Sequence, residues 1–89
     1  MHSLLNDTHR FPGPYRVKVI GENSPAFVKR VAETAVAALH GRSCDEITER
    51  PSAKGTHLGV TLTFQINSAE EVLAVYEALR NVEGLRMVL

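Results

Sequence analysis

The chain has 89 residues, with 10 Lys and Arg against 10 Asp and Glu, so its formal net charge is 0. A neutral chain has no global positive field to attract phosphates, which argues against general nucleic-acid binding. Hydrophobic residues make up 44% and Cys44 is the only cysteine, so the composition excludes a disordered chain and a disulfide-rich scaffold. We expect one soluble domain.

Residues 1–14 predict a flexible N-terminal tail that ends in a stiff turn at Pro12–Pro14. The first residues are not apolar enough for a signal peptide, and no apolar run is long enough to span a membrane. We therefore expect a cytoplasmic protein whose single folded domain comprises residues 15–89.

The first half of this domain predicts a strand followed by a helix. Apolar and polar residues alternate over Tyr15–Ile20, which is the period of a strand with one buried face. Ser24 is a suitable N-cap, and Pro25 suits the first helical position, where no backbone N–H is needed. A helix is predicted from Pro25 to about His40, with Gly41 ending it. Its apolar stripe comprises Val28, Val31, Ala32, Ala35, Val36 and Leu39.

The second half predicts two strands, a helix and a last strand. Residues 45–51 form an edge strand, because Pro51 cannot donate to a ladder, and residues 52–56 form a turn. His57–Ile66 alternates strictly and predicts a long strand. Ser68 and Glu71 form a capping box at the start of the second helix. The buried stripe of this helix is expected to comprise Val72, Leu73, Tyr76, Leu79 and Val82, and residues 85–89 form a short terminal strand.

The element order is therefore β-α-β-β-α-β. Two helices with one apolar stripe each must cover one face of a four-stranded sheet. Right-handed crossovers make this an α+β fold of the ferredoxin-like class, a two-layer sandwich with an antiparallel sheet and both helices on one face.

The opposite face of the sheet is expected to be locally basic, although the chain is neutral. With Val17 and Val19 inward, alternation places Arg16 and Lys18 outward, together with Arg86 from the last strand. This basic sheet face could dock an anionic ligand or an acidic partner. It could equally be a solvated face whose cations prevent edge aggregation.

Two loops supply further candidate ligand-binding residues. Ser24 and the helix N-terminus that follows it form a candidate cradle for a carboxylate, although ordinary capping explains Ser24 as well. Arg50, Lys54 and Gly55 lie at the turn between the second and third strands. Arg50 and Lys54 are the expected anion contacts there.

No catalytic or metal-binding constellation is visible. The histidines have no ligand spacing, and one cysteine cannot supply the remaining ligands, so no metal and no cofactor are expected. Cys44 with His40 could be a nucleophile pair, but no third group orients them, and a structural thiol is the simpler interpretation. The outward positions of the central strands carry no aromatic residue on which bases could stack.

Three segments together resemble the YbeD family of small bacterial proteins, often labelled lipoic-acid-binding regulatory proteins. They are residues 15–21 (YRVKVIG), residues 50–55 (RPSAKG) and residues 86–89 (RMVL), and the resemblance covers about Phe11 to Leu89. The resemblance implies a ferredoxin-like fold similar to ACT regulatory domains, and it supplies no catalytic residues. Where the family usually has an apolar residue two positions after Ile47, this chain has Glu49.

The preferred hypothesis is a non-enzymatic regulatory domain that binds a small anionic ligand or a protein partner. A lipoate-related ligand is implied by the family label alone, and neither nucleic acid nor a membrane is an expected partner. The alternative is a homo-oligomeric module, for example a homodimer. The last strand ends in the apolar residues Met87–Leu89, and at a sheet edge these would favour pairing with a second copy. A small enzyme is the third hypothesis, and it lacks a visible acid–base or nucleophile constellation.

Overall fold

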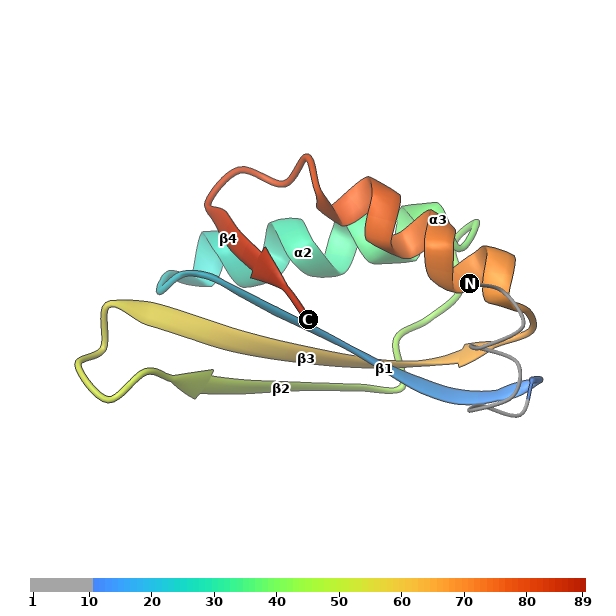
Figure 1. Ribbon diagram of the computed structural model, residues 1–89, viewed down its shortest axis with the longest axis horizontal. Helices are drawn as coiled ribbons and strands as arrows, with labels where there is room; N and C mark the ends of the chain where they lie inside the picture. Colours follow the sequence, from blue (N-terminus) through green and yellow to red (C-terminus); the bar gives the residue numbers. More distant parts are fainter. Residues whose placement is uncertain (1–10) are drawn as a thin grey trace.

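The computed structural model describes residues 11–89, which contain four strands and two helices (Figure 1). Residues 1–10, most of the predicted tail, lie outside the described residues. In chain order the elements are β1 (Gly13–Glu22), α2 (Pro25–Ala38), β2 (Glu46–Pro51), β3 (His57–Ile66), α3 (Ala69–Leu79) and β4 (Leu85–Val88). The sheet has the order β2-β3-β1-β4 and every neighbouring pair is antiparallel. The predicted ferredoxin-like fold is confirmed.

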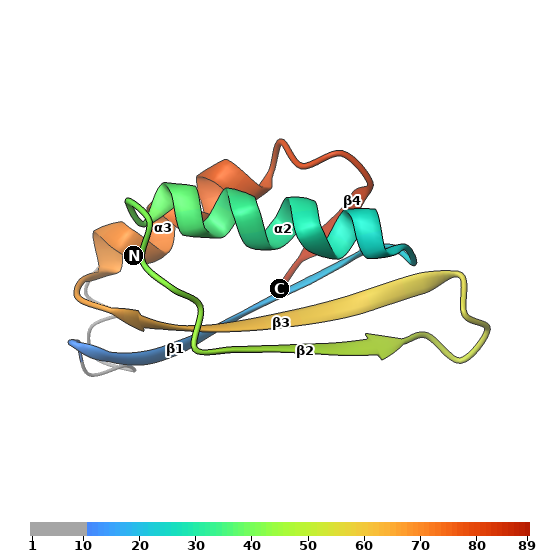
Figure 2. The ribbon, with the colours of Figure 1, turned by 180° about the vertical axis from the view of Figure 1, so that it is seen from behind.

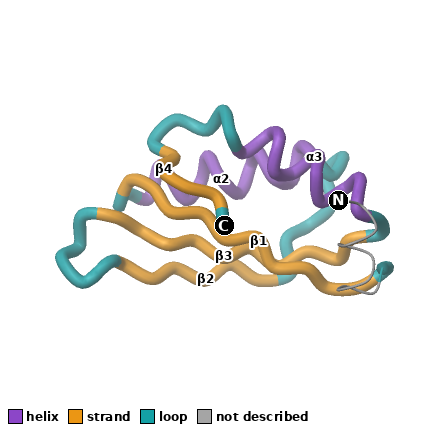
Figure 3. Tube along the Cα trace, in the orientation of Figure 1, coloured by secondary structure: helices purple, strands orange, loops and turns teal. Residues whose placement is uncertain are grey.

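Both helices lie on the same face of the sheet, and the other face carries no helix (Figures 1 and 2). The long strands β1 and β3 form the centre of the sheet, and the shorter β4 runs beside only part of β1 (Figure 3). Every residue of β2 is exposed, because the helix layer does not extend over this edge. Glu49, on the helix-facing side of β2 opposite Val60, is therefore a solvated residue rather than a buried charge.

The core confirms the strand alternation and corrects the helix stripes. Val17 and Val19 of β1 are buried, as are the five apolar side chains of β3 that alternate from Leu58 to Ile66. In the helices, Phe27 and Val75 are completely buried although neither was in the predicted stripes. Leu73, which was predicted to be buried, is 39% exposed.

The folded domain begins earlier than Tyr15. β1 starts at Gly13, so the expected stiff turn at Pro12–Pro14 instead leads directly into the sheet. Phe11 is partly buried against the core, and its ring centroid lies 6.3 Å from that of Tyr15. The domain boundary expected between residues 14 and 15 therefore falls inside β1.

The first helix begins and ends as its sequence predicts. The Ser24 hydroxyl accepts a hydrogen bond from the Phe27 N–H at 3.2 Å, and Pro25 is the first residue of α2. At the other end His40 takes a left-handed conformation with φ of 57°, followed by Gly41 with φ of 87°. The Gly41 N–H donates to the Val36 carbonyl at 2.9 Å and closes the helix.

A bidentate ion pair connects the segment after α2 to the start of α3. The Arg42 guanidinium donates to both carboxylate oxygens of Glu71, at 2.7 and 2.9 Å, and also to the Gln65 carbonyl at 2.9 Å. Glu71 accepts a further hydrogen bond from the Asn67 N–H at 2.7 Å. The predicted capping box is therefore shifted by one residue, since Glu71 reaches the residue before the Ser68 N-cap.

We predict that this ion pair makes stability depend on pH. The hydrogen bonds from Arg42 hold the pKa of Glu71 below its ordinary value. The pKa of Glu71 is lower in the folded than in the unfolded chain. The ion pair therefore contributes fully to the free energy of unfolding above the unfolded pKa of Glu71, and this contribution is lost as pH falls through the folded pKa. Glu71→Gln should therefore cost about 1 kcal/mol at neutral pH, and chemical denaturation should find this difference shrinking below about pH 4.

The matched control is Glu33→Gln, which removes an exposed carboxylate from α2. It should change stability little at either pH. A difference between Glu71→Gln and the parent chain that grows on acidification would contradict this account of the ion pair.

Candidate functional site

The open face of the sheet gathers the outward residues of β1, β2 and β3 into rows. The register sets Arg16 opposite Thr63, which in turn faces Glu46. The next row contains Lys18 with Thr61 and Thr48, and the third contains Ile20 with Gly59 and Arg50. Glu46 therefore lies at one end of this face. Toward the other end, Lys18 and Arg50 lie beside Gly59, which has no side chain.

Lys18 and Arg50 line a shallow hollow whose floor is Gly59. The hollow has a volume of about 200 Å³ and is completed by Ile20, Pro51, Ser52 and His57. The Lys18 side chain leans over the floor, because its Cε would lie 3.7 Å from a Cβ placed on Gly59. No carboxylate lines the hollow. Within residues 11–89 neither cation forms an ion pair.

Arg86 stands apart from the row in which the sequence placed it. β1 and β4 pair with Ile20 opposite Met87 and Gly21 opposite Leu85, so a bulge leaves Arg86 as the extra residue. Met87, and not Arg86, therefore occupies the position beside outward-facing Ile20. The expected group of Arg16, Lys18 and Arg86 is not a single cluster.

The expected carboxylate cradle at Ser24 already holds a carboxylate of this chain. Ser24 donates a hydrogen bond to the Glu22 carboxylate at 3.1 Å while its oxygen caps α2. The other Glu22 oxygen lies 4.0 Å from the Arg30 guanidinium. An incoming anion would have to displace Glu22, which favours the capping interpretation of Ser24.

The loop before α2 and the turn between β2 and β3 lie together, as a shared site would require. The Asn23 side-chain amide donates to the Gly55 carbonyl at 2.8 Å. Gly55 has φ of 74° and serves as the flexible residue of this turn. Lys54 is exposed and does not line the hollow. Of the four loop candidates, Ser24, Arg50, Lys54 and Gly55, only Arg50 contributes to it.

Cys44 does not form a nucleophile pair with His40. Its thiol donates to the Glu46 carbonyl at 3.0 Å and lies 3.5 Å from the Thr63 carbonyl, which is the geometry of a structural thiol. Among the described residues no three His, Cys, Asp or Glu side chains gather as a metal site. None of the helices over residues 11–89 has the length and apolar character to cross a membrane.

The residues that sequence reasoning missed at the hollow are His57 and Gly59. Both lie in the long strand that the alternation predicted, but their relation to Arg50 depends on the register of the β2–β3 hairpin. The available signal was Gly59, a glycine within the strand that precedes Thr61 and Thr63 on its outward side.

Comparisons with known proteins identify the relatives of this fold. A family model described as "Protein of unknown function (DUF493)" matches residues 6–89. A UPF0250 protein of Citrobacter koseri and the UPF0250 protein YbeD of Salmonella arizonae are each 36% identical over 89 residues, covering 100% of both chains.

Two solved structures share the fold at low sequence identity. The C-terminal domain of the MgtC protein from Mycobacterium tuberculosis matches with a TM-score of 0.69 and 16% identity, covering 91% of this chain and 87% of that domain. The ACT domain from GTP pyrophosphokinase of Chlorobium tepidum matches with a TM-score of 0.58 and 16% identity, covering 85% and 94%. The fold is ACT-like, and this chain, by its sequence, belongs to the DUF493 family together with the UPF0250 YbeD proteins.

Proposed function

We propose that this protein is a non-enzymatic regulatory domain that binds a small anionic group on the open face of its sheet. The observation that carries the proposal is the hollow over Gly59, which Lys18 and Arg50 both line and which no carboxylate lines. Two cations at one shallow site, neither of them in an ion pair within residues 11–89, favour a carboxylate or a phosphate. The ACT-like fold supports a regulatory role, since one neighbour of this fold is an ACT domain taken from a larger enzyme.

The size of the hollow limits what it can take. About 200 Å³ is below the range of roughly 300–1,000 Å³ that encloses a drug-sized ligand. The hollow suits the charged end of a ligand, while the remainder would lie along the threonines of the open face. A medium-chain carboxylate fits this description, and lipoate is one member of that class.

We predict that the Arg50→Gln variant loses most of its affinity for such anions. Titrations of the isotope-labelled chain with octanoate, lipoate and inorganic phosphate should shift the backbone amide signals of Lys18, Gly59 and His57. Losing one charge-assisted hydrogen bond should weaken binding by roughly tenfold or more. Raising the salt concentration should weaken it further, because the site is exposed.

Arg16→Gln is the matched control for this titration. It removes one positive charge from the same face, two rows away and across Thr63 from Glu46. It should leave the shifts at Gly59 intact. Absence of any shift with all three anions, or an equal loss of affinity in both variants, would remove the anion-binding proposal.

A further inference from the structure

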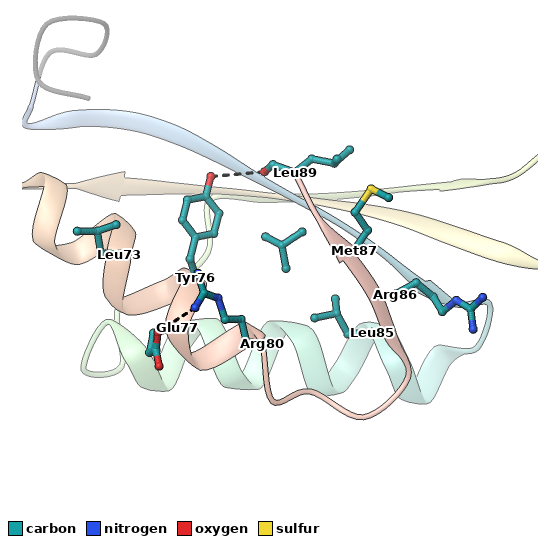
Figure 4. Close-up of a pocket in the computed structure, with 9 residues that line it drawn as sticks. Leu73, Tyr76, Glu77, Arg80, Leu85, Arg86, Met87 and Leu89 are labelled. Carbon is teal, nitrogen blue, oxygen red and sulfur yellow. Dashed lines mark hydrogen bonds and ion pairs between the residues drawn. The ribbon is translucent and has the colours of Figure 1, made fainter. Parts of the chain in front are cut away.

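An apolar groove runs between α3 and β4, at the edge of the sheet remote from β2 (Figure 4). Its volume is about 740 Å³, and its walls are one side of α3 and residues 85–89. Among the described residues four large apolar side chains are exposed, and Leu73, Met87 and Leu89 all line this groove. Exposed apolar surface gathered at one place on a small domain indicates contact with another protein surface.

The groove is bordered by an edge strand that is open to pairing. The Leu89 N–H donates to the Lys18 carbonyl at 2.8 Å, and Val88 lies opposite Val19. In an antiparallel ladder the backbone groups of successive residues alternate sides, so those of Val88 face away from β1. Such an edge is a template for another strand.

The two edges of the sheet differ in how they are protected. β2 carries Glu46, Glu49 and Arg50 and ends in Pro51, and charges and proline are the usual protection against edge pairing. β4 contains only one charged residue, Arg86, and no proline. An added strand is therefore favoured at β4.

We propose that the groove and the β4 edge bind a second copy of this chain through a two-fold axis. In this arrangement β4 pairs antiparallel with the β4 of the second copy, and the two α3 helices lie side by side above the joined sheet. The exposed Leu73, Met87 and Leu89 of each copy are then covered by the same surface of the other, as a two-fold interface requires.

Charge along α3 favours a second copy over an unrelated peptide. Glu77 and Arg80 stand one turn apart on the rim of the groove and form an ion pair of 3.5 Å in which both side chains are more than 70% exposed. When two such helices lie antiparallel, the acid of each can face the base of the other. The rim is thus complementary to itself.

The dimer is independent of the anion site. Lys18, Arg50 and Gly59 do not line the groove, and the groove residues do not line the hollow. Pairing at β4 would extend the open face across both copies and leave both hollows accessible. The two proposals therefore fail or succeed separately.

The test is the oligomeric state of the full chain, measured by sedimentation equilibrium from micromolar to millimolar concentration. We expect the parent chain to form a dimer. Met87→Lys, which adds facing cations at the edge, should raise the dissociation constant at least about tenfold. Ile47→Lys is the matched control, since Ile47 is exposed to a similar degree at the opposite edge, and it should dimerise like the parent.

A charge exchange tests the antiparallel arrangement of α3. Glu77→Arg should weaken the dimer, and adding Arg80→Glu to it should restore association. Circular dichroism spectra should show that each variant is folded. A parent chain that stays monomeric, a dimer that Ile47→Lys weakens and Met87→Lys does not, or a double variant that fails to recover would each overturn the proposal.

Discussion

Replacing Phe27 with alanine is expected to lower the free energy of unfolding by about 3–5 kcal/mol. Phe27 lies in the first turn of α2, its side chain is completely buried, and its ring fills the space over Gly21. Alanine would leave a cavity where α2 packs on the end of β1. Small domains have a total stability of about 5–15 kcal/mol, so the variant should be close to unfolding.

Urea denaturation followed by circular dichroism measures this effect. The control is Ile47→Ala, which truncates an apolar side chain that is 41% exposed on β2 and should cost less than about 1 kcal/mol. Equal losses in the two variants would mean that Phe27 does not anchor α2 as the packing indicates.

The strand pattern was predictable because each long strand has one buried and one open face. Val17 and Val19 in β1 and the alternation over β3 identify the core face without knowledge of the partners. The helix caps were also local, since Ser24 and Ser68 both bond the N–H three residues ahead. Topology then followed from the general rules of packing and handedness.

The buried residues of the helices were predicted with errors because burial depends on which element packs against each side of a helix. Leu73 adjoins Val72 in the sequence and is equally apolar, but the short β4 leaves the side of α3 that carries it uncovered. Phe27 was missed because it falls close to the helix start, where capping residues dominate the pattern. The length of a neighbouring strand is a tertiary property that periodicity does not contain.

The candidate site was predicted only in part. Its residues come from different strands, and the sequence does not give the register between those strands. Alternation placed Lys18 outward and Arg50 was expected at the turn after the second strand, but only the register of β1, β2 and β3 sets both of them beside Gly59. Arg86 was grouped with Arg16 and Lys18 by alternation, which fails at the bulge between Ile20 and Gly21. Ser24 carried the signature of a cradle, and the Glu22 side chain that occupies it could not be oriented from sequence.

Gly21→Ala is expected to destabilise the domain by about 3 kcal/mol, more than its single added methyl group suggests. A Cβ at this position would lie 2.5 Å from the Gly84 carbonyl oxygen on one side and would collide with the Phe27 ring on the other. The backbone just before β4 and a buried ring cannot both move aside in a closely packed core. The start of β4 should be displaced, because Gly21 pairs with Leu85 and the Glu22 N–H donates to the Gly84 carbonyl at 2.9 Å.

Gly59→Ala is the matched control, since Gly59 is also a strand glycine. Its Cβ would meet only the Arg50 carbonyl oxygen at 3.5 Å and the end of the Lys18 side chain at 3.7 Å, which are ordinary contacts. Alanine there should preserve stability or raise it by up to about 1 kcal/mol. Denaturation measures both variants, and hydrogen exchange should find that Gly21→Ala lowers the protection of the Leu89 amide, which donates to Lys18. Unchanged stability in Gly21→Ala would contradict the close approach of β1, β4 and α2 at this position.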